Sequence, residues 1–148
     1  MICEMFSYYA TRGISLLDKL KELYAQYGYC MNTLHSYEFE GSSGFAKMQK
    51  ILAQFRQGVH TFGGKTVLEL LDYAQGLNGL PKADVLKYLL EDNCSVVIRP
   101  SGTEPKLKAY ISVRAESRQE AQTLERRISE ELQDKFVDKE PAQPCGVI

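Results

Sequence analysis

A short segment near residue 100 carries the side chains of this sequence that are best suited to bind an anion. Arg99 can make a bidentate, charge-assisted contact, and the hydroxyl groups of Ser101 and Thr103 can each donate a hydrogen bond. Gly102 has no Cβ atom, so it permits unusual backbone angles and lets neighbouring amides point inward as an anion-binding nest. Phosphate fits this set of donors, and the segment Arg99–Lys106 (RPSGTEPK) is the candidate site.

The residues around this segment favour a preorganised loop with local positive charge. Pro100 and Pro105 fix the backbone angle φ on both sides, which reduces the entropy lost when a ligand binds. Lys108 follows, and residues 99–114 contain four basic residues and one acidic residue, whereas the whole chain has a net charge of -1. The alternative is that this segment is only a tight turn between two strands, with Arg99 and Lys108 solvated. Composition alone favours the two interpretations equally.

Alternation of apolar and polar residues predicts the strands that position this loop. Residues 107–113 alternate strictly, so one face of that strand is apolar and the other is basic. In the first candidate strand Glu69 interrupts the pattern, and Val67 and Leu70 are expected on opposite faces. The predicted strands are residues 67–73, 86–90, 94–99 and 107–113.

Two helices are predicted to cover the apolar face of this sheet. Apolar residues at helical spacing between Phe45 and Phe55 form one amphipathic helix. Ser117 and Glu120 form a capping box, which begins a second helix whose apolar stripe runs to Phe136. The predicted fold is therefore α+β, an antiparallel sheet of about four strands with helices packed on one face.

The first forty residues are predicted to be helical and to precede this sheet. Apolar residues recur at helical spacing from Ile2, and Ser15 can cap a second helix that ends before Gly28. Because six of the nine tyrosines lie here, we expect helices that pack against something larger than each other. The predicted division is residues 1–40, a domain of residues 41–137, and a flexible tail of residues 138–148.

Composition and charge argue against several classes of function. The chain has 148 residues, 44% of them hydrophobic and 25% charged, and its near-neutral charge provides no general attraction for nucleic acid or anionic membrane. Uninterrupted apolar runs are far shorter than the roughly 20 residues of a membrane-spanning helix, so we expect no membrane partner. The N-terminus does not have the pattern of a signal peptide, so we expect a cytoplasmic location.

Cysteine and histidine spacing predicts neither a metal centre nor a nucleophilic device. The four cysteines include no C-x-x-C pair, and no histidine lies near enough in sequence to complete a zinc site. His35 and His60 adjoin no plausible nucleophile. We therefore expect free thiols, no catalytic residue and no metal ligand in this chain.

The loop and its flanking segments resemble a known family of phosphosugar enzymes. Arg99–Pro105 matches R-x-S-G-T-x-P, the phosphate-loop signature of the α-D-phosphohexomutases, the phosphoglucomutase and phosphomannomutase superfamily. The residues that follow, through Tyr110, are most similar to the phosphoglucomutase and phosphopentomutase branch. Residues 2–5 and 23–29 resemble the helices that close the family's third domain. The resemblance implies a TATA-binding-protein-like C-terminal domain, preceded by two helices left from the third domain.

The same resemblance implies a fragment of an isomerase that interconverts hexose 1-phosphate and hexose 6-phosphate, with glucose the expected sugar. In this family the phosphoryl group moves through an active-site phosphoserine and a bisphosphate intermediate, here glucose 1,6-bisphosphate, with Mg²⁺. The serine loop and the metal loop do not occur in this sequence, so we expect an inactive fragment whose partners are the remaining domains of the parent enzyme and a phosphorylated sugar. By similarity, the phosphate that is not transferred is held by Arg99, Ser101, Gly102, Thr103 and Lys108.

Other functions stay open at this point. Within the family, phosphomannomutase and phosphopentomutase activities are alternatives. A single-stranded nucleic-acid module is a second class, based on the basic and aromatic residues Lys106, Lys108, Tyr110 and Arg114 along one strand. A protein-interaction module that uses the tyrosine-rich N-terminal helices is a third.

Overall fold

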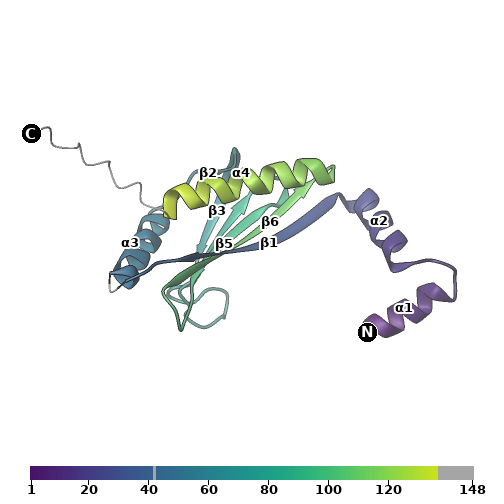
Figure 1. Cartoon of the computed structure of the whole chain (residues 1–148), viewed down its shortest axis with the longest axis horizontal. Helices are drawn as coiled ribbons and strands as arrows, with labels where there is room; N and C mark the ends of the chain where they lie inside the picture. Colours follow the sequence, from purple (N-terminus) through teal and green to yellow (C-terminus); the bar gives the residue numbers. More distant parts are fainter. Residues whose placement is uncertain (42, 137–148) are drawn as a thin grey trace, which may run out of the picture.

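The computed structural model describes residues 1–41 and 43–136 of the chain (Figure 1). In chain order the elements are α1 (Ile2–Ala10), α2 (Leu16–Tyr27), β1 (Tyr29–Glu38), α3 (Gly44–Arg56), β2 (Thr61–Phe62), β3 (Lys65–Asp72), β4 (Leu86–Leu90), the 3₁₀ turn η1 (Glu91–Asn93), β5 (Ser95–Pro100), β6 (Lys106–Ala115) and α4 (Arg118–Phe136).

The strands form one sheet in the order β1-β6-β5-β4-β3-β2, and each of these pairs is antiparallel. The α+β prediction is confirmed, and the four predicted strands correspond to β3, β4, β5 and β6. The described part of the sheet has six strands rather than about four. One of the additional strands is β2, which pairs with β3 through a turn in which Gly63 and Gly64 both have positive φ.

The other additional strand is β1, and here the prediction of helix up to residue 40 is wrong. Residues 29–38 pair with β6 at ten consecutive positions, and their side chains are alternately half-buried and exposed. Tyr29, Met31 and Tyr37 pack against the core from this strand. The period of two is weak in the sequence because the intervening inward positions carry Thr33 and His35, whose shared polar partner, Glu125 of α4, lies 92 and 90 residues away.

The core lies between one face of the sheet and the helices α3 and α4 (Figure 1). Among the described residues, every fully buried strand side chain belongs to this face, as predicted. An aromatic cluster joins the layers, with ring centroids of Phe55 and Tyr88 6.5 Å apart and those of Phe55 and Phe136 5.2 Å apart. The Tyr88 hydroxyl also donates a 2.6 Å hydrogen bond to the Phe55 carbonyl oxygen, which fixes the end of α3 to β4.

The face assignment within β3 differs from the prediction. The pairing of β3 with β4 shifts register between Val67 and Glu69, so a β-bulge interrupts this strand. As a result Val67 lies opposite Leu90 and Leu70 lies opposite Tyr88, and both Val67 and Leu70 pack against the core. Because of the extra residue at the bulge, Leu70 lies on the core face together with Val67, whereas in a regular strand the two would lie on opposite faces.

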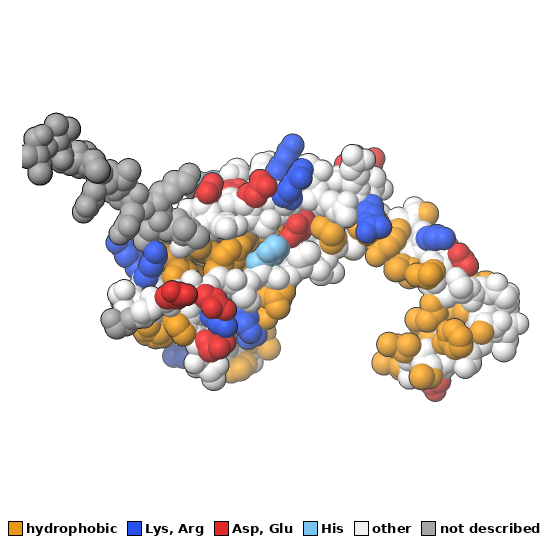
Figure 2. All heavy atoms as spheres, viewed as in Figure 1, with side chains coloured by type: hydrophobic (Ala, Val, Ile, Leu, Met, Phe, Trp, Pro, Cys, Tyr) orange, Lys and Arg blue, Asp and Glu red, His pale blue; other side chains and the backbone are white. Residues whose placement is uncertain are grey.

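The helices α1 and α2 form an arm beside the sheet, at the right of Figure 1. Both were predicted, and Ser15 caps α2 by accepting a 3.1 Å hydrogen bond from the Asp18 amide. Neither helix contains a buried residue, and Ile2 and Leu17 are 74% and 69% exposed. Figure 2 shows the hydrophobic side chains gathered on this arm.

No helix within the described ranges is long and apolar enough to cross a membrane. The predicted tail, residues 138–148, lies outside the part of the chain that the structure describes.

Candidate functional site

The predicted anion site lies at one end of the sheet, in the connection between β5 and β6. The register places Arg99 of β5 directly opposite Lys108 of β6, and Lys108 directly opposite Ser36 of β1. These three side chains therefore form a row across the face that the helices do not cover. Two basic groups face each other in this row, an arrangement that is unfavourable unless an anion lies between or above them.

The backbone of the loop is closed at its base and open at its tip. The Ser101 amide donates a 2.7 Å hydrogen bond to the Lys106 carbonyl oxygen, and the Phe39 amide donates a 2.9 Å hydrogen bond to the Pro105 carbonyl oxygen. Within the described residues, the amides of Gly102 and Thr103 donate to no protein acceptor. The tip thus keeps backbone donors available for a ligand.

The hydroxyl groups of the loop are available in the same way. Ser101 is half-buried and Thr103 is exposed, and neither hydroxyl makes a hydrogen bond to another described residue. Gly102 lies outside the left-handed region of φ, so the expected need for unusual angles is not met in this conformation. A Cβ at Gly102 would meet no atom within 4 Å, so its absence leaves open space at the tip rather than relieving a clash.

Lys106 pairs with the two acidic groups beside the loop. Its ammonium group lies 2.8 Å from a carboxylate oxygen of Glu38 and 3.3 Å from one of Glu104. The hydrogen bond to Glu38, followed by that to Glu104, raises the pKa of Lys106. Both carboxylates next to the site therefore share one ammonium group, which offsets part of their negative charge.

By contrast, Arg99 and Lys108 form no ion pair with any described residue. The Arg99 guanidinium instead donates a 3.0 Å hydrogen bond from Nη2 to the Tyr110 hydroxyl, and its central carbon lies 5.5 Å from the centre of the Tyr110 ring. Two positive charges without an acidic partner among the described residues therefore lie at the end of the sheet that carries the loop, an arrangement suited to a phosphate dianion.

The structure places all five predicted site residues at the same end of the sheet, with Ser36 and Tyr110 on the neighbouring positions of the uncovered face. Ser36 was missed because residues 29–38 were assigned to a helix, although the period-two alternation of Tyr29, Met31 and Tyr37 was present in the sequence. The sequence places Tyr110 in the segment that resembles the phosphoglucomutase branch and on a possible nucleic-acid surface, without a contact to Arg99. Its contact with Arg99 depends on the register of the β5–β6 pair, which sequence spacing alone does not fix.

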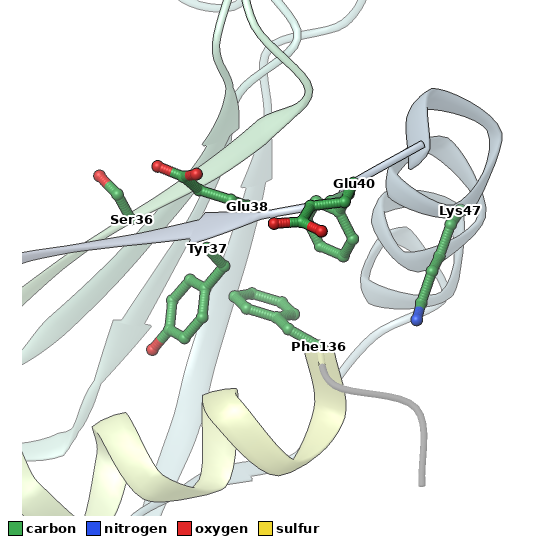
Figure 3. Close-up of a pocket in the computed structure, with 7 residues that line it drawn as sticks. Ser36, Tyr37, Glu38, Glu40, Lys47 and Phe136 are labelled. Carbon is green, nitrogen blue, oxygen red and sulfur yellow. The ribbon is translucent and has the colours of Figure 1, made fainter. Parts of the chain in front are cut away.

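One cavity lies near this end of the sheet and another lies at the opposite end. None of the five predicted residues lines either cavity. The first, about 340 Å³, lies where β1 ends, between Tyr37, Phe136 and Lys47. Figure 3 shows Tyr37 and Phe136 on the helix side of β1, with Ser36 and Glu38 pointing to the other side. The second, about 1110 Å³, lies beside the first turn of α4. The candidate anion site therefore lies outside both cavities.

Possible metal ligands do not gather near the loop. In residues 1–41 and 43–136 no group of three or more His, Cys, Asp or Glu side chains is arranged to hold a metal ion. The residues of the candidate site are donors and cations, and this chemistry suits an anion rather than a metal.

Comparison with known proteins places this domain. The profile described as "Phosphoglucomutase/phosphomannomutase, C-terminal domain" matches residues 39–132. A phosphoglucomutase of Staphylococcus saprophyticus is 33% identical over 117 residues, which cover 71% of this chain and 21% of that protein. A phosphoglucomutase of Staphylococcus epidermidis is 34% identical over 113 residues, covering 68% and 20%.

A solved structure has a similar fold. The open form of the Paramecium phosphoprotein pp63/parafusin, a phosphoglucomutase, superimposes with a TM-score of 0.51 at 17% identity, covering 80% of this chain and 21% of that one. The chain spans about a fifth of the length of these three relatives.

Fold and sequence together define a domain of the phosphohexomutase type. The chain belongs to the phosphoglucomutase/phosphomannomutase family, in which it corresponds to the C-terminal domain. The resemblance inferred from Arg99–Pro105 is thereby confirmed.

Proposed function

We propose that this chain is the substrate-phosphate-binding part of a phosphoglucomutase-like enzyme that interconverts hexose 1-phosphate and hexose 6-phosphate. The observation that carries the proposal is the direct opposition of Arg99 and Lys108, without an acidic partner in the described chain, beside a loop tip with open donors. The C-terminal-domain match and the phosphoglucomutase relatives support it. Glucose is the proposed sugar, and mannose and pentose phosphates are the alternatives within the family.

In this proposal each residue of the loop has a distinct part. Arg99 makes a two-point contact with phosphate oxygens, and Lys108 adds a point charge from the neighbouring strand. The hydroxyls of Ser101 and Thr103 donate to the remaining oxygens. Gly102 leaves room for the phosphate to approach the backbone amides.

These residues position the substrate and do not react with it. The phosphate that they hold is the one that is not transferred, so their binding energy aligns the distant reacting phosphate for in-line transfer. The proposed reaction passes through a phosphoserine and through glucose 1,6-bisphosphate, which must turn around so that each phosphate visits this loop in turn. The serine and the Mg²⁺ ligands are proposed to lie in other domains of the parent enzyme, so the fragment alone is expected to be inactive.

The proposed organisation keeps a division of the chain near residue 40. The helices α1 and α2 are proposed to come from the preceding domain, and their exposed apolar side chains are proposed to pack against it. The domain that follows carries the phosphate loop. Strand β1 joins the two parts, because it follows α2 directly and pairs with β6.

A nucleic-acid-binding role is less well supported by the arrangement of charge. The basic row proposed for it includes Lys106, whose charge is compensated by Glu38 and Glu104. The uncompensated cations converge on one end of the sheet instead of following an extended backbone.

The proposal is tested by a ¹H-¹⁵N NMR titration of the chain with glucose 1,6-bisphosphate. Shift changes confined to residues 99–108 are expected, and they should be lost in Arg99→Ala. Arg114→Ala is the matched control, because Arg114 lies on the same strand face at the other end of β6. The absence of shift changes at millimolar ligand, or changes that survive in Arg99→Ala, would contradict the proposal.

A further inference from the structure

Tyr110 lies on the uncovered face of the sheet, one register step from the pair of cations. It is directly opposite Leu34 on β1 and directly opposite Val97 on β5, so its ring has an apolar neighbour on each side. Arg99 is two residues beyond Val97 on β5, and its side chain extends back to the Tyr110 hydroxyl, with 3.0 Å between Nη2 and the phenolic oxygen. Tyr110 therefore contacts Arg99 without belonging to the loop.

The surroundings of Arg99 explain why such a contact is useful. Arg99 is exposed, and a long exposed side chain loses much rotamer freedom when it binds a ligand. Lys108, directly opposite, repels the guanidinium, and the described residues offer Arg99 no carboxylate. Among them the Tyr110 hydroxyl is the side-chain acceptor that holds the guanidinium, and the ring face adds a cation–π contact at 5.5 Å.

The contact leaves the binding capacity of the guanidinium intact. A guanidinium has five N–H donors in a planar fork, and the Tyr110 hydroxyl uses one of those on Nη2. One two-point edge of the fork is left for phosphate oxygens. The same geometry can therefore hold Arg99 in place before and after a ligand binds.

We propose that Tyr110 is a positioning residue, which holds the Arg99 guanidinium in the orientation that binds phosphate. This inference rests on the proposed function of the loop and adds a residue outside its signature. In this inference the neighbours on both adjacent strands, Leu34 and Val97, restrict the ring, and the hydroxyl in turn holds Arg99. Tyr110 lowers the entropic cost of binding and makes no contact with the phosphate itself.

The first test compares the affinity of the chain for glucose 1,6-bisphosphate in wild type and Tyr110→Phe, which keeps the ring and removes the acceptor. Affinity should fall about three- to tenfold, as expected for one lost hydrogen bond. Ser112→Ala is the matched control. It removes a hydroxyl from the same strand face, one that donates a 2.6 Å hydrogen bond to Asn32 and does not touch Arg99, and it should leave affinity unchanged.

The coupling to Arg99 gives a result that general loss of structure would not give. In an Arg99→Ala background, Tyr110→Phe should cause no further loss of affinity. Equal or tighter binding by the single variant Tyr110→Phe would overturn the inference. It would mean that the Tyr110 hydroxyl contributes nothing to phosphate binding, or that it holds Arg99 away from the ligand. Additive losses in the double variant would overturn it as well.

A second readout needs no ligand and separates this inference from the proposed function. ¹⁵N relaxation of the Arg99 Nε–H group should show a more ordered guanidinium in wild type and Ser112→Ala than in Tyr110→Phe. Equal mobility in all three proteins contradicts the positioning role alone. Wild-type protein with an ordered Arg99 that binds no bisphosphate contradicts the proposed function of the loop instead.

Discussion

Replacing Lys108 by methionine should change phosphate affinity and fold stability in opposite directions. Lys108 is half-buried on β6, directly opposite Arg99, and no acidic group among the described residues pairs with either cation. Methionine retains the unbranched length of the side chain while removing its charge. The variant therefore loses one charge-assisted contact with phosphate and, at the same time, one repulsive contact within the protein.

The magnitude of the repulsion follows from the strand geometry. Residues directly opposite on neighbouring strands have Cβ atoms about 5 Å apart, so flexible cationic ends lie about 7 Å apart. At that distance two like charges in water repel each other by about 0.6 kcal/mol. Screening leaves about 0.5 kcal/mol in 0.01 M salt and about 0.25 kcal/mol at about 0.15 M salt.

Thermal unfolding at two salt concentrations checks this estimate. Lys108→Met should raise Tm by about 1–2 °C in low salt, and the gain should shrink by about half at physiological salt. Its affinity for glucose 1,6-bisphosphate should fall at least about tenfold. Lys106→Met is the matched control on the same strand face, and it should lower stability because Glu38 and Glu104 lose their partner.

Destabilisation of the fold by Lys108→Met in low salt would contradict this prediction. That result would mean that Lys108 has a stabilising partner that outweighs the repulsion from Arg99. A stability gain that does not depend on salt would point to improved apolar packing and would refute the electrostatic explanation.

Two further predictions concern how the sheet is held. Tyr88→Phe should lower the free energy of unfolding by about 1 kcal/mol in urea titrations, because Tyr88 is fully buried and its hydroxyl bonds to the Phe55 carbonyl; an unchanged midpoint would show that this bond contributes nothing. Arg56 bridges Asp72 and Asp84, and burial raises the pKa of Asp72 while hydrogen bonds from the Ala74 amide and Arg56 lower it, to a net value below the ordinary 3.8. The stabilisation by this ion pair is present above pH 3.8 and is lost as pH falls through the pKa of Asp72 in the folded state. Arg56→Met should therefore lower the free energy of unfolding by about 1 kcal/mol at pH 7, and its stability should depend less on pH below 3.8. Acid unfolding identical to that of wild type would contradict this role.

The strands beside the loop could be predicted because the polarity of their residues matches the side of the sheet on which each residue lies. In β6 the inward positions are apolar and the outward positions are polar or basic, so the period of two is visible without any knowledge of the fold, and the β-branched run Val96–Ile98 indicates β5. The loop was found from its residue types for the same reason. Its donors are consecutive in the chain, and their chemistry does not depend on a distant partner.

The parts that were missed depend on contacts between distant segments. In β1 the inward His35 lies 2.6 Å from Glu125 of α4, so a polar residue is tolerated where the alternation required an apolar one. In β3 the bulge after Val67 reverses the faces, and its position is set by pairing with β4. The hydrogen bond from Arg99 to Tyr110 likewise needs the register of two strands.

The central claim is that the β5–β6 loop holds a substrate phosphate, and a crystal structure of this chain with glucose 1,6-bisphosphate tests it most directly. The account predicts one phosphate group within hydrogen-bond distance of the Arg99 guanidinium, the hydroxyls of Ser101 and Thr103, and the Lys108 ammonium. A bisphosphate bound elsewhere on the protein, with this loop empty in the same crystal, would contradict it.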